Sequence, residues 1–137
     1  MRTRVLVSRC LLGEACRWHG RAVRPSWFLR KWREKHPGAV LVPVCPEELG
    51  GLPTPRPPVK RRKGRVYETC ADKKRRPQVT GADVTEAFEL GAARTLETAR
   101  REGCRQAILC KWSPSCDRQG ITGRLLAAEG FEVISTF

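Results

Sequence analysis

The sequence contains no apolar stretch long enough to cross a bilayer, and its early apolar segment, Val5-Leu6-Val7, is too short for a signal peptide. Acidic residues are scarce: 14 of them face 27 lysines and arginines, which leaves a formal net charge of +13 on 137 residues. We therefore expect one cytoplasmic domain, residues 1–137, without membrane contact. Its charge favours nucleic acid, nucleotides or other phosphates as partners, although an arginine-rich proteome would give the same excess.

The cysteines also lack a familiar spacing. None of the seven forms a C-x-x-C pair, which argues against a zinc knuckle and against a thioredoxin-like dithiol. A disulfide framework is equally unexpected in a chain without an export signal. Reduced thiols, a bound metal or a cluster are the interpretations that remain.

Short apolar runs alternate with amphipathic segments along the chain. We expect strands at 5–8, 39–44, 107–111 and 131–135, and helices at 26–35, from 83 or 85 to 102, and at 122–129. This alternation predicts a single-domain α/β fold with a mostly parallel sheet flanked by helices, a Rossmann-like arrangement. The basic segment at about 60–80 is expected to be an exposed loop or hairpin with a short strand near Val66.

Three cysteines stand at or just beyond the carboxyl end of a predicted strand: Cys10, Cys45 and Cys116. Such strand ends meet at one edge of a parallel sheet, where ligands bind. Three thiols gathered there would hold a metal or cluster and leave one coordination position open. The alternative is that they are buried as small apolar side chains.

The other four cysteines are weaker candidates. Cys110 lies inside an apolar strand and is expected in the core, and Cys104 belongs to the opposite edge of the sheet. Cys16 and Cys70 lie in polar loops. Of these four, Cys16 is close enough to Cys10 in sequence to serve as a reserve ligand.

Several segments together resemble the thiouracil desulfurase (TudS-like) family, long catalogued as a domain of unknown function. They are Ser8-Arg9-Cys10-Leu11-Leu12-Gly13, Val42-Pro43-Val44-Cys45-Pro46-Glu47 with the Gly-Gly and proline-rich run to Pro58, Gly81-Ala82-Asp83-Val84-Thr85 with Phe88, and Ser113-Pro114-Ser115-Cys116. The resemblance covers nearly the whole chain. It implies a 4Fe-4S cluster on Cys10, Cys45 and Cys116, with one iron free to take the sulfur of a thiolated uracil and to release uracil and sulfide.

The same resemblance makes Glu47 and Ser113 candidates for catalysis. Replacing C=S by C=O requires an activated water and proton transfer, which a carboxylate of raised pKa can perform. The alternatives are structural: Glu47 would accept hydrogen bonds from loop amides, and Ser113 would cap a turn. Gly50 and Gly51 are expected to let the chain turn closely past the cluster.

Three further residues are candidates for binding substrate. Arg9 and Trp112 stand where the family has smaller residues, so they would contact a phosphate and stack on a base, or only fill space. Arg56, held between two prolines, offers a planar fork to a phosphate or a uracil carbonyl, unless it is a surface arginine. The substrate expected is therefore a thiolated uracil base, nucleotide or tRNA, with the basic loop available to nucleic acid.

Two other functions remain open. The chain would be a basic RNA-binding module whose cysteines carry structural zinc or stay free, or an enzyme that inserts sulfur into RNA. The second function needs an activated nucleotide, and the sequence has no P-loop to bind one.

Overall fold

A parallel sheet forms the centre of the computed structural model, which describes residues 2–69 and 81–137. The sheet has the order β2-β1-β5-β6, and every neighbouring pair is parallel. Its strands are β1 (Arg4–Ser8), β2 (Val40–Val44), β5 (Gln106–Cys110) and β6 (Glu132–Thr136). The predicted α/β architecture is confirmed.

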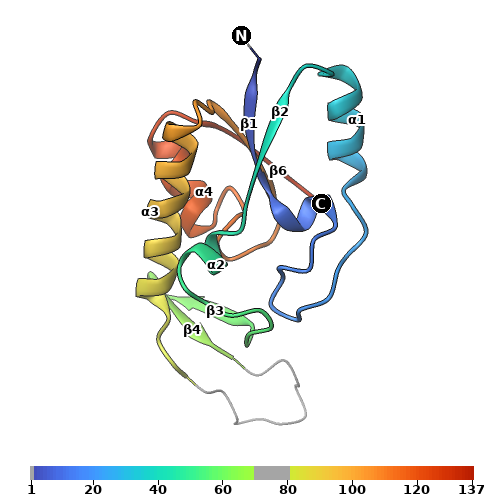
Figure 1. The fold of residues 1–137 in the computed structure, drawn as a ribbon. Coiled ribbons are helices and arrows are strands. Elements are labelled where there is room, and N and C mark those ends of the chain that lie inside the picture. Colours follow the sequence, from blue (N-terminus) through green and yellow to red (C-terminus); the bar gives the residue numbers. More distant parts are fainter. Residues whose placement is uncertain (1, 70–80) are drawn as a thin grey trace.

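Helices cover both faces of the sheet (Figure 1). Helix α1 (Trp27–Lys35) lies on one face, and α3 (Thr85–Arg101) and α4 (Ile121–Ala128) lie on the other. The two central strands are therefore continuous apolar runs, and residues 5–7 and 107–109 are fully buried.

Side-chain oxygens accept hydrogen bonds from backbone amides at the start of two helices. Ser26 Oγ accepts a hydrogen bond from the Leu29 amide at 3.1 Å at the start of α1. Before α3, Asp83 Oδ1 accepts one from the Thr85 amide at 3.0 Å. Each predicted long helix is present within a residue or two. Two short ones were not expected: η1 (Arg9–Leu12), a 3₁₀ turn after β1, and α2 (Pro46–Leu49) after β2.

Helix α2 packs backbone to backbone against α3. A Cβ atom added to Gly50 would lie 2.0 Å from the Ala87 carbonyl oxygen, and one added to Gly91 would lie 2.0 Å from that of Pro46. Gly50 is therefore required for contact with α3 and not for a close turn past a cluster, which corrects the expectation from sequence. Gly51, with φ of +90°, allows the chain to turn after α2.

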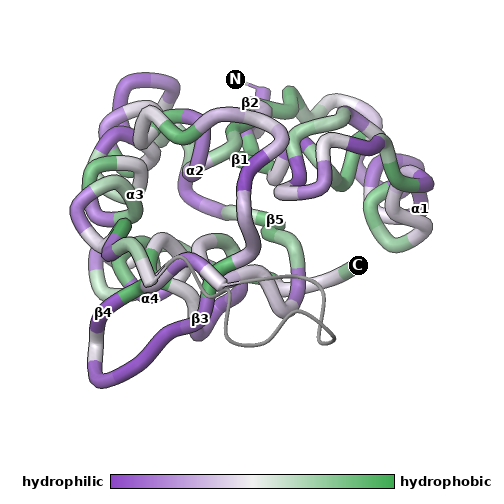
Figure 2. Tube along the Cα trace, turned by 90° about the horizontal axis from the view of Figure 1, so that it is seen from below, coloured by the Kyte–Doolittle hydropathy of each residue, from purple (hydrophilic) through white to green (hydrophobic). Residues whose placement is uncertain are grey.

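The described part of the basic segment is an antiparallel hairpin of β3 (Val59–Arg62) and β4 (Arg65–Glu68). The hydrophilic colouring of this hairpin contrasts with the apolar sheet strands in Figure 2. Cys70 and the second basic run, residues 73–76, lie outside the described residues. No helix within 2–69 or 81–137 is both long and apolar enough to span a membrane.

Candidate active site

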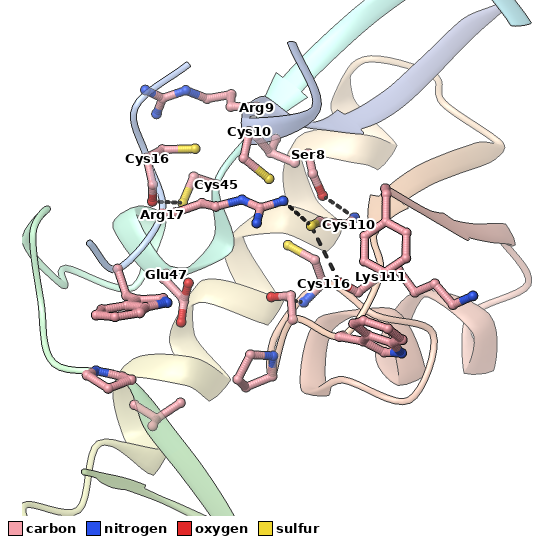
Figure 3. Close-up of a pocket in the computed structure, with 18 of the residues that line it drawn as sticks. Ser8, Arg9, Cys10, Cys16, Arg17, Cys45, Glu47, Cys110, Lys111 and Cys116 are labelled. Atoms are coloured by element: carbon pink, nitrogen blue, oxygen red, sulfur yellow. Dashed lines mark hydrogen bonds between the residues drawn. The ribbon is translucent and has the colours of Figure 1, made fainter. Parts of the chain in front are cut away.

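A pocket of about 330 Å³ opens at the carboxyl edge of the sheet, and five cysteines line it (Figure 3). Three are the predicted ligands: Cys10 in η1 directly after β1, Cys45 directly after β2, and Cys116 in the loop after β5. Because β2, β1 and β5 are neighbours, residues up to 106 positions apart meet at one site. All three side chains are buried, with 6–8% of each residue exposed.

The loop that carries Cys116 is held by serine hydroxyls. Ser113 Oγ accepts hydrogen bonds from the amides of Cys116 at 3.1 Å and Ser115 at 3.3 Å. Ser115 Oγ lies 3.6 Å from Cys116 Sγ, to which it donates. Ser113 also lines the pocket. Ser113 therefore caps a turn, which is the structural role considered from the sequence. It also faces the space where a substrate would lie.

Cys110 is buried in the core, as its apolar strand predicts, and it also lines the pocket. Its backbone amide donates to Ser8 Oγ at 2.9 Å, which fastens the end of β5 to the end of β1. Its sulfur lines the pocket and accepts a hydrogen bond from Arg17 Nη2 at 3.1 Å (Figure 3). As the last residue of β5, Cys110 lies at the boundary between the core and the pocket.

The thiols differ in how readily they ionise. Hydrogen bonds from Cys110 and Cys16 lower the pKa of Cys10 to about 3, and a hydrogen bond from Cys16 lowers the pKa of Cys45 to about 7. The same contacts with Cys10, together with burial, raise the pKa values of Cys16 and Cys110. Burial raises the pKa of Cys116 to about 12. The lowered pKa values of Cys10 and Cys45 favour the thiolate, the form that binds metals, whereas the raised pKa of Cys116 favours the neutral thiol.

Glu47 lies in α2 and lines the pocket with a side chain that is only 14% exposed. Its Oε2 accepts a hydrogen bond from Arg56 Nη2 at 2.6 Å. Burial raises the pKa of Glu47, although the charge and hydrogen bond of Arg56 oppose that shift. A carboxylate in this position can exchange protons with a ligand in the pocket.

Arg56 itself does not line the pocket, contrary to the expectation that it faces substrate. Its side chain is 3% exposed and lies behind Glu47. Besides the Glu47 carboxylate, it donates to the Cys16 carbonyl at 2.9 Å and to Thr54 Oγ1 at 2.8 Å. Arg56 therefore acts on the site by fixing Glu47 and the loop of Cys16. The rigid proline-flanked backbone was visible in the sequence, but the direction of the side chain was not.

The mouth of the pocket contains exposed charged and aromatic side chains. Arg9 lines it and is paired with Glu14 and Glu48, both at 2.7 Å. Trp112 also lines it and is 77% exposed, with its ring edge-on to Phe137 at a centroid distance of 4.6 Å. Both candidates from sequence thus lie where a ligand would enter.

A second groove of about 500 Å³ adjoins the mouth. It shares four residues, 111–114, with the pocket and adds Arg61 from the hairpin, Asp117 and Gln119. Lys111 Nζ lies 5.8 Å from the centroid of the Trp112 ring, so cationic and aromatic groups stand together there.

Sequence reasoning missed Arg17. This residue lines the pocket from an irregular segment, residues 13–26, whose composition gives no periodic signal. Its neighbour Cys16 is the one local hint of a role near the thiols.

Together, the fold and the pocket define a class of protein: a small α/β domain with a cysteine-lined site at the carboxyl edge of a parallel sheet. Residues 5–136 match the family described as 2-thiouracil desulfurase, and the chain belongs to this family. It is 33% identical to YbbK of Bacillus subtilis (strain 168), a protein described as uncharacterized, over 96% of this chain and 94% of the relative.

One solved structure extends the similarity to three dimensions. It is the 4Fe-4S-dependent thiouracil desulfidase TudS, with a TM-score of 0.78 and 32% sequence identity. The match covers 98% of this chain and 91% of the other. The cluster and the activity in that description belong to the solved protein.

The pocket in this chain has features that fit an iron–sulfur cluster. It combines buried thiols with Arg17 Nε, a buried donor that has no hydrogen-bond partner in the described residues. An anionic, sulfur-rich group would supply the missing acceptor. Within 2–69 and 81–137, no three Cys, His, Asp or Glu side chains converge on the position of a single metal ion. A cluster does not require such convergence, because each of its ligands binds a different iron.

Proposed function

We propose that this protein is a 4Fe-4S-dependent desulfurase that converts the C=S group of a thiolated uracil to C=O and releases sulfide. The observation that carries the proposal is the meeting of Cys10, Cys45 and Cys116 with a buried glutamate in one pocket. These three thiols would hold the cluster and leave one iron without a protein ligand. That iron would supply a Lewis acid for the thiocarbonyl sulfur.

Glu47 is proposed as the proton-transfer group. The overall change adds water: the water oxygen bonds to the ring carbon, the C–S bond breaks, and both water protons leave with the sulfur as hydrogen sulfide. Glu47 would take a proton from the attacking water and return it to the departing sulfur. Its raised pKa makes the carboxylate a stronger base than a solvated one and keeps its acid form available to higher pH.

Ser113 is proposed to orient the uracil ring. Its oxygen already accepts two backbone amides, and its hydroxyl hydrogen is therefore available to donate, either to Ser115 Oγ at 3.2 Å or to a ligand. A donor beside a uracil carbonyl or ring nitrogen would select the position of the thiocarbonyl group.

The adjoining groove favours a nucleotide over the free base as substrate. A base in the pocket would leave its ribose and phosphate near Lys111 and Arg61, with Trp112 able to stack on the base. The basic hairpin would extend the same positive surface to a thiolated tRNA, which is the alternative substrate.

Anaerobic reconstitution followed by assay of several substrates tests this function. We expect loss of the thiocarbonyl absorbance and release of sulfide with 2-thiouracil, 4-thiouridine and 4-thiouridine 5′-monophosphate, with the lowest KM for the nucleotide. Equal KM values for base and nucleotide would remove the proposed role of the groove. A colourless wild-type protein that holds zinc and binds RNA in a salt-dependent manner would instead support the RNA-binding alternative.

A further inference from the structure

Arg17 is the cation of the inner pocket for which the proposed chemistry has not yet given a role. Its Nη2 donates to Cys110 Sγ at 3.1 Å, and Figure 3 shows its guanidinium among the sulfur atoms. Its Nε is buried and has no hydrogen-bond partner in the described part of the chain. A buried donor without an acceptor is costly, and most such groups in folded proteins are satisfied.

The other basic residues around the pocket have partners for their charge, including Arg56, whose Nε is also buried without an acceptor among the described residues. Arg9 is neutralised by two glutamates at the mouth, and Arg56 is neutralised by Glu47 behind the wall. Lys111 lies over the rings of Trp112 and Phe137 at 5.8 and 5.6 Å. The structure shows no carboxylate within ion-pair distance of Arg17 among residues 2–69 and 81–137. Its positive charge is therefore directed at the thiols.

We propose that Arg17 compensates the negative charge that three thiolates and a sulfide-containing cluster bring into the pocket, and that its Nε–H donates to a sulfur of that assembly. This inference rests on the proposed function, because it assumes that a cluster is the bound group. Arg17 is a positioning residue here: it binds the assembly from beside the ligands and is not itself a ligand.

A measurable consequence concerns the reduction potential. Reduction adds negative charge, so a nearby guanidinium and a hydrogen bond to sulfur stabilise the reduced state and raise the potential. Removing the charge should therefore make the cluster harder to reduce. Substrate binding by Arg17 would instead change KM and leave the potential of the substrate-free protein unaltered.

The test compares Arg17→Gln, Arg17→Lys and Arg21→Gln in the reconstituted protein without substrate. Arg21 is an exposed arginine on the same loop and serves as the matched control. We expect a redox titration followed by visible absorbance and electron paramagnetic resonance to show a more negative potential for Arg17→Gln. Arg17→Lys should lie between it and wild type, and Arg21→Gln should equal wild type.

Two outcomes would overturn the proposal. One is a loaded Arg17→Gln protein with the wild-type potential, especially with a raised KM for 2-thiouracil. The other is a variant that loads no iron and also melts early as the cluster-free protein, which would make Arg17 a structural residue. Lost loading with unchanged melting of the cluster-free protein would support the proposal.

The proposed function can be refuted independently of the role proposed for Arg17. A wild-type protein that carries the cluster but leaves thiouracil intact would refute desulfuration, while the comparison of potentials would still decide the role of Arg17. A wild-type protein that cannot be loaded with a cluster would refute both proposals.

Discussion

The inner wall and the mouth of the pocket both contain arginine–glutamate pairs, but in different surroundings. At the inner wall, Glu47 is paired with Arg56 behind it, and their side chains are 14% and 3% exposed. At the mouth, Arg9 and Glu14 are paired with side chains that are 35% and 49% exposed. A buried pair holds its members in one geometry and is costly to break, whereas an exposed pair is screened by water.

This difference suggests that the inner wall and the mouth of the pocket have separate roles. The inner wall holds the thiols and Glu47, to which we assign the proposed reaction. The mouth, with Arg9, Trp112 and the neighbouring groove, is open to solvent and can vary with the substrate. The predictions below test whether changes on the two sides have these separate effects.

The largest effect is expected from the proposed ligands. Cys45→Ala and Cys116→Ala each remove one of three thiolates, so the reconstituted proteins should lose most of their iron and visible absorbance. Cys104→Ala is the matched control, because Cys104 is also buried but does not line the pocket. Iron content equal to wild type in Cys45→Ala would contradict the ligand assignment.

The next effect is that of Glu47→Gln, which keeps the shape of the side chain and removes its basicity. Turnover should fall by about 10²- to 10⁴-fold, the usual contribution of a general acid or base, while iron content stays at the wild-type level. Glu48→Gln, at the mouth, should change turnover much less because Glu48 is paired with Arg9. Similar losses in both variants would remove the distinction between wall and mouth.

Arg56→Met should act through Glu47. Leaving a buried carboxylate without its partner should lower the free energy of unfolding by about 3–5 kcal/mol. Arg9→Met, at the mouth, should cost at most about 1 kcal/mol. Chemical denaturation of both variants measures the two values, and equal losses would contradict the proposed contrast.

The pH dependence of Arg56→Met gives a second test. Burial raises the pKa of Glu47 in the folded protein and Arg56 lowers it, so the variant should have a still higher Glu47 pKa. The acid limb of kcat/KM, which reports ionisation of the base, should therefore move to higher pH. The stability that Glu47 contributes is complete below its ordinary pKa of 4.5 and is lost as the pH rises through the pKa in the folded protein. In Arg56→Met this loss should therefore extend to higher pH. An acid limb that stays at the wild-type pH would show that Arg56 does not control the ionisation of Glu47.

The smallest effect is expected at Trp112. Loss of stacking in Trp112→Ala should raise KM about tenfold, since base stacking contributes roughly 1–3 kcal/mol, and should leave kcat and iron content near wild type. Trp27, which is also exposed but lies on α1 away from the pocket, provides the control variant Trp27→Ala. A KM that is unchanged in Trp112→Ala would leave this ring without a role in binding.

Much of this site could be predicted from local pattern. Cys10, Cys45 and Cys116 follow apolar runs that form adjacent parallel strands, so one rule about strand ends places them together. The contact between Arg56 and Glu47 could not be predicted, because it depends on how the chain returns after α2. The core position of Cys110 was predicted correctly, but its contact with the pocket was not, because that contact depends on the strand ending at this residue.

Arg17 shows a different limit of sequence reasoning. Its segment has no regular secondary structure, and many of the 27 basic residues in this chain lie on exposed surface. Within the described residues, Arg17 and Arg56 both have a buried Nε without an acceptor, but only Arg56 is paired with a carboxylate, and this difference becomes visible only when side chains are placed. Gly50 is similar, since the need for glycine arises from the approach of α3.

The most direct test of the central claim is the reaction of anaerobically reconstituted protein with 2-thiouracil, with uracil and sulfide measured together. We predict equal amounts of uracil and sulfide from protein that holds about four iron atoms per chain, and neither product from the cluster-free protein. Turnover that persists without the cluster, or a fully loaded protein that leaves 2-thiouracil unchanged, would contradict the account.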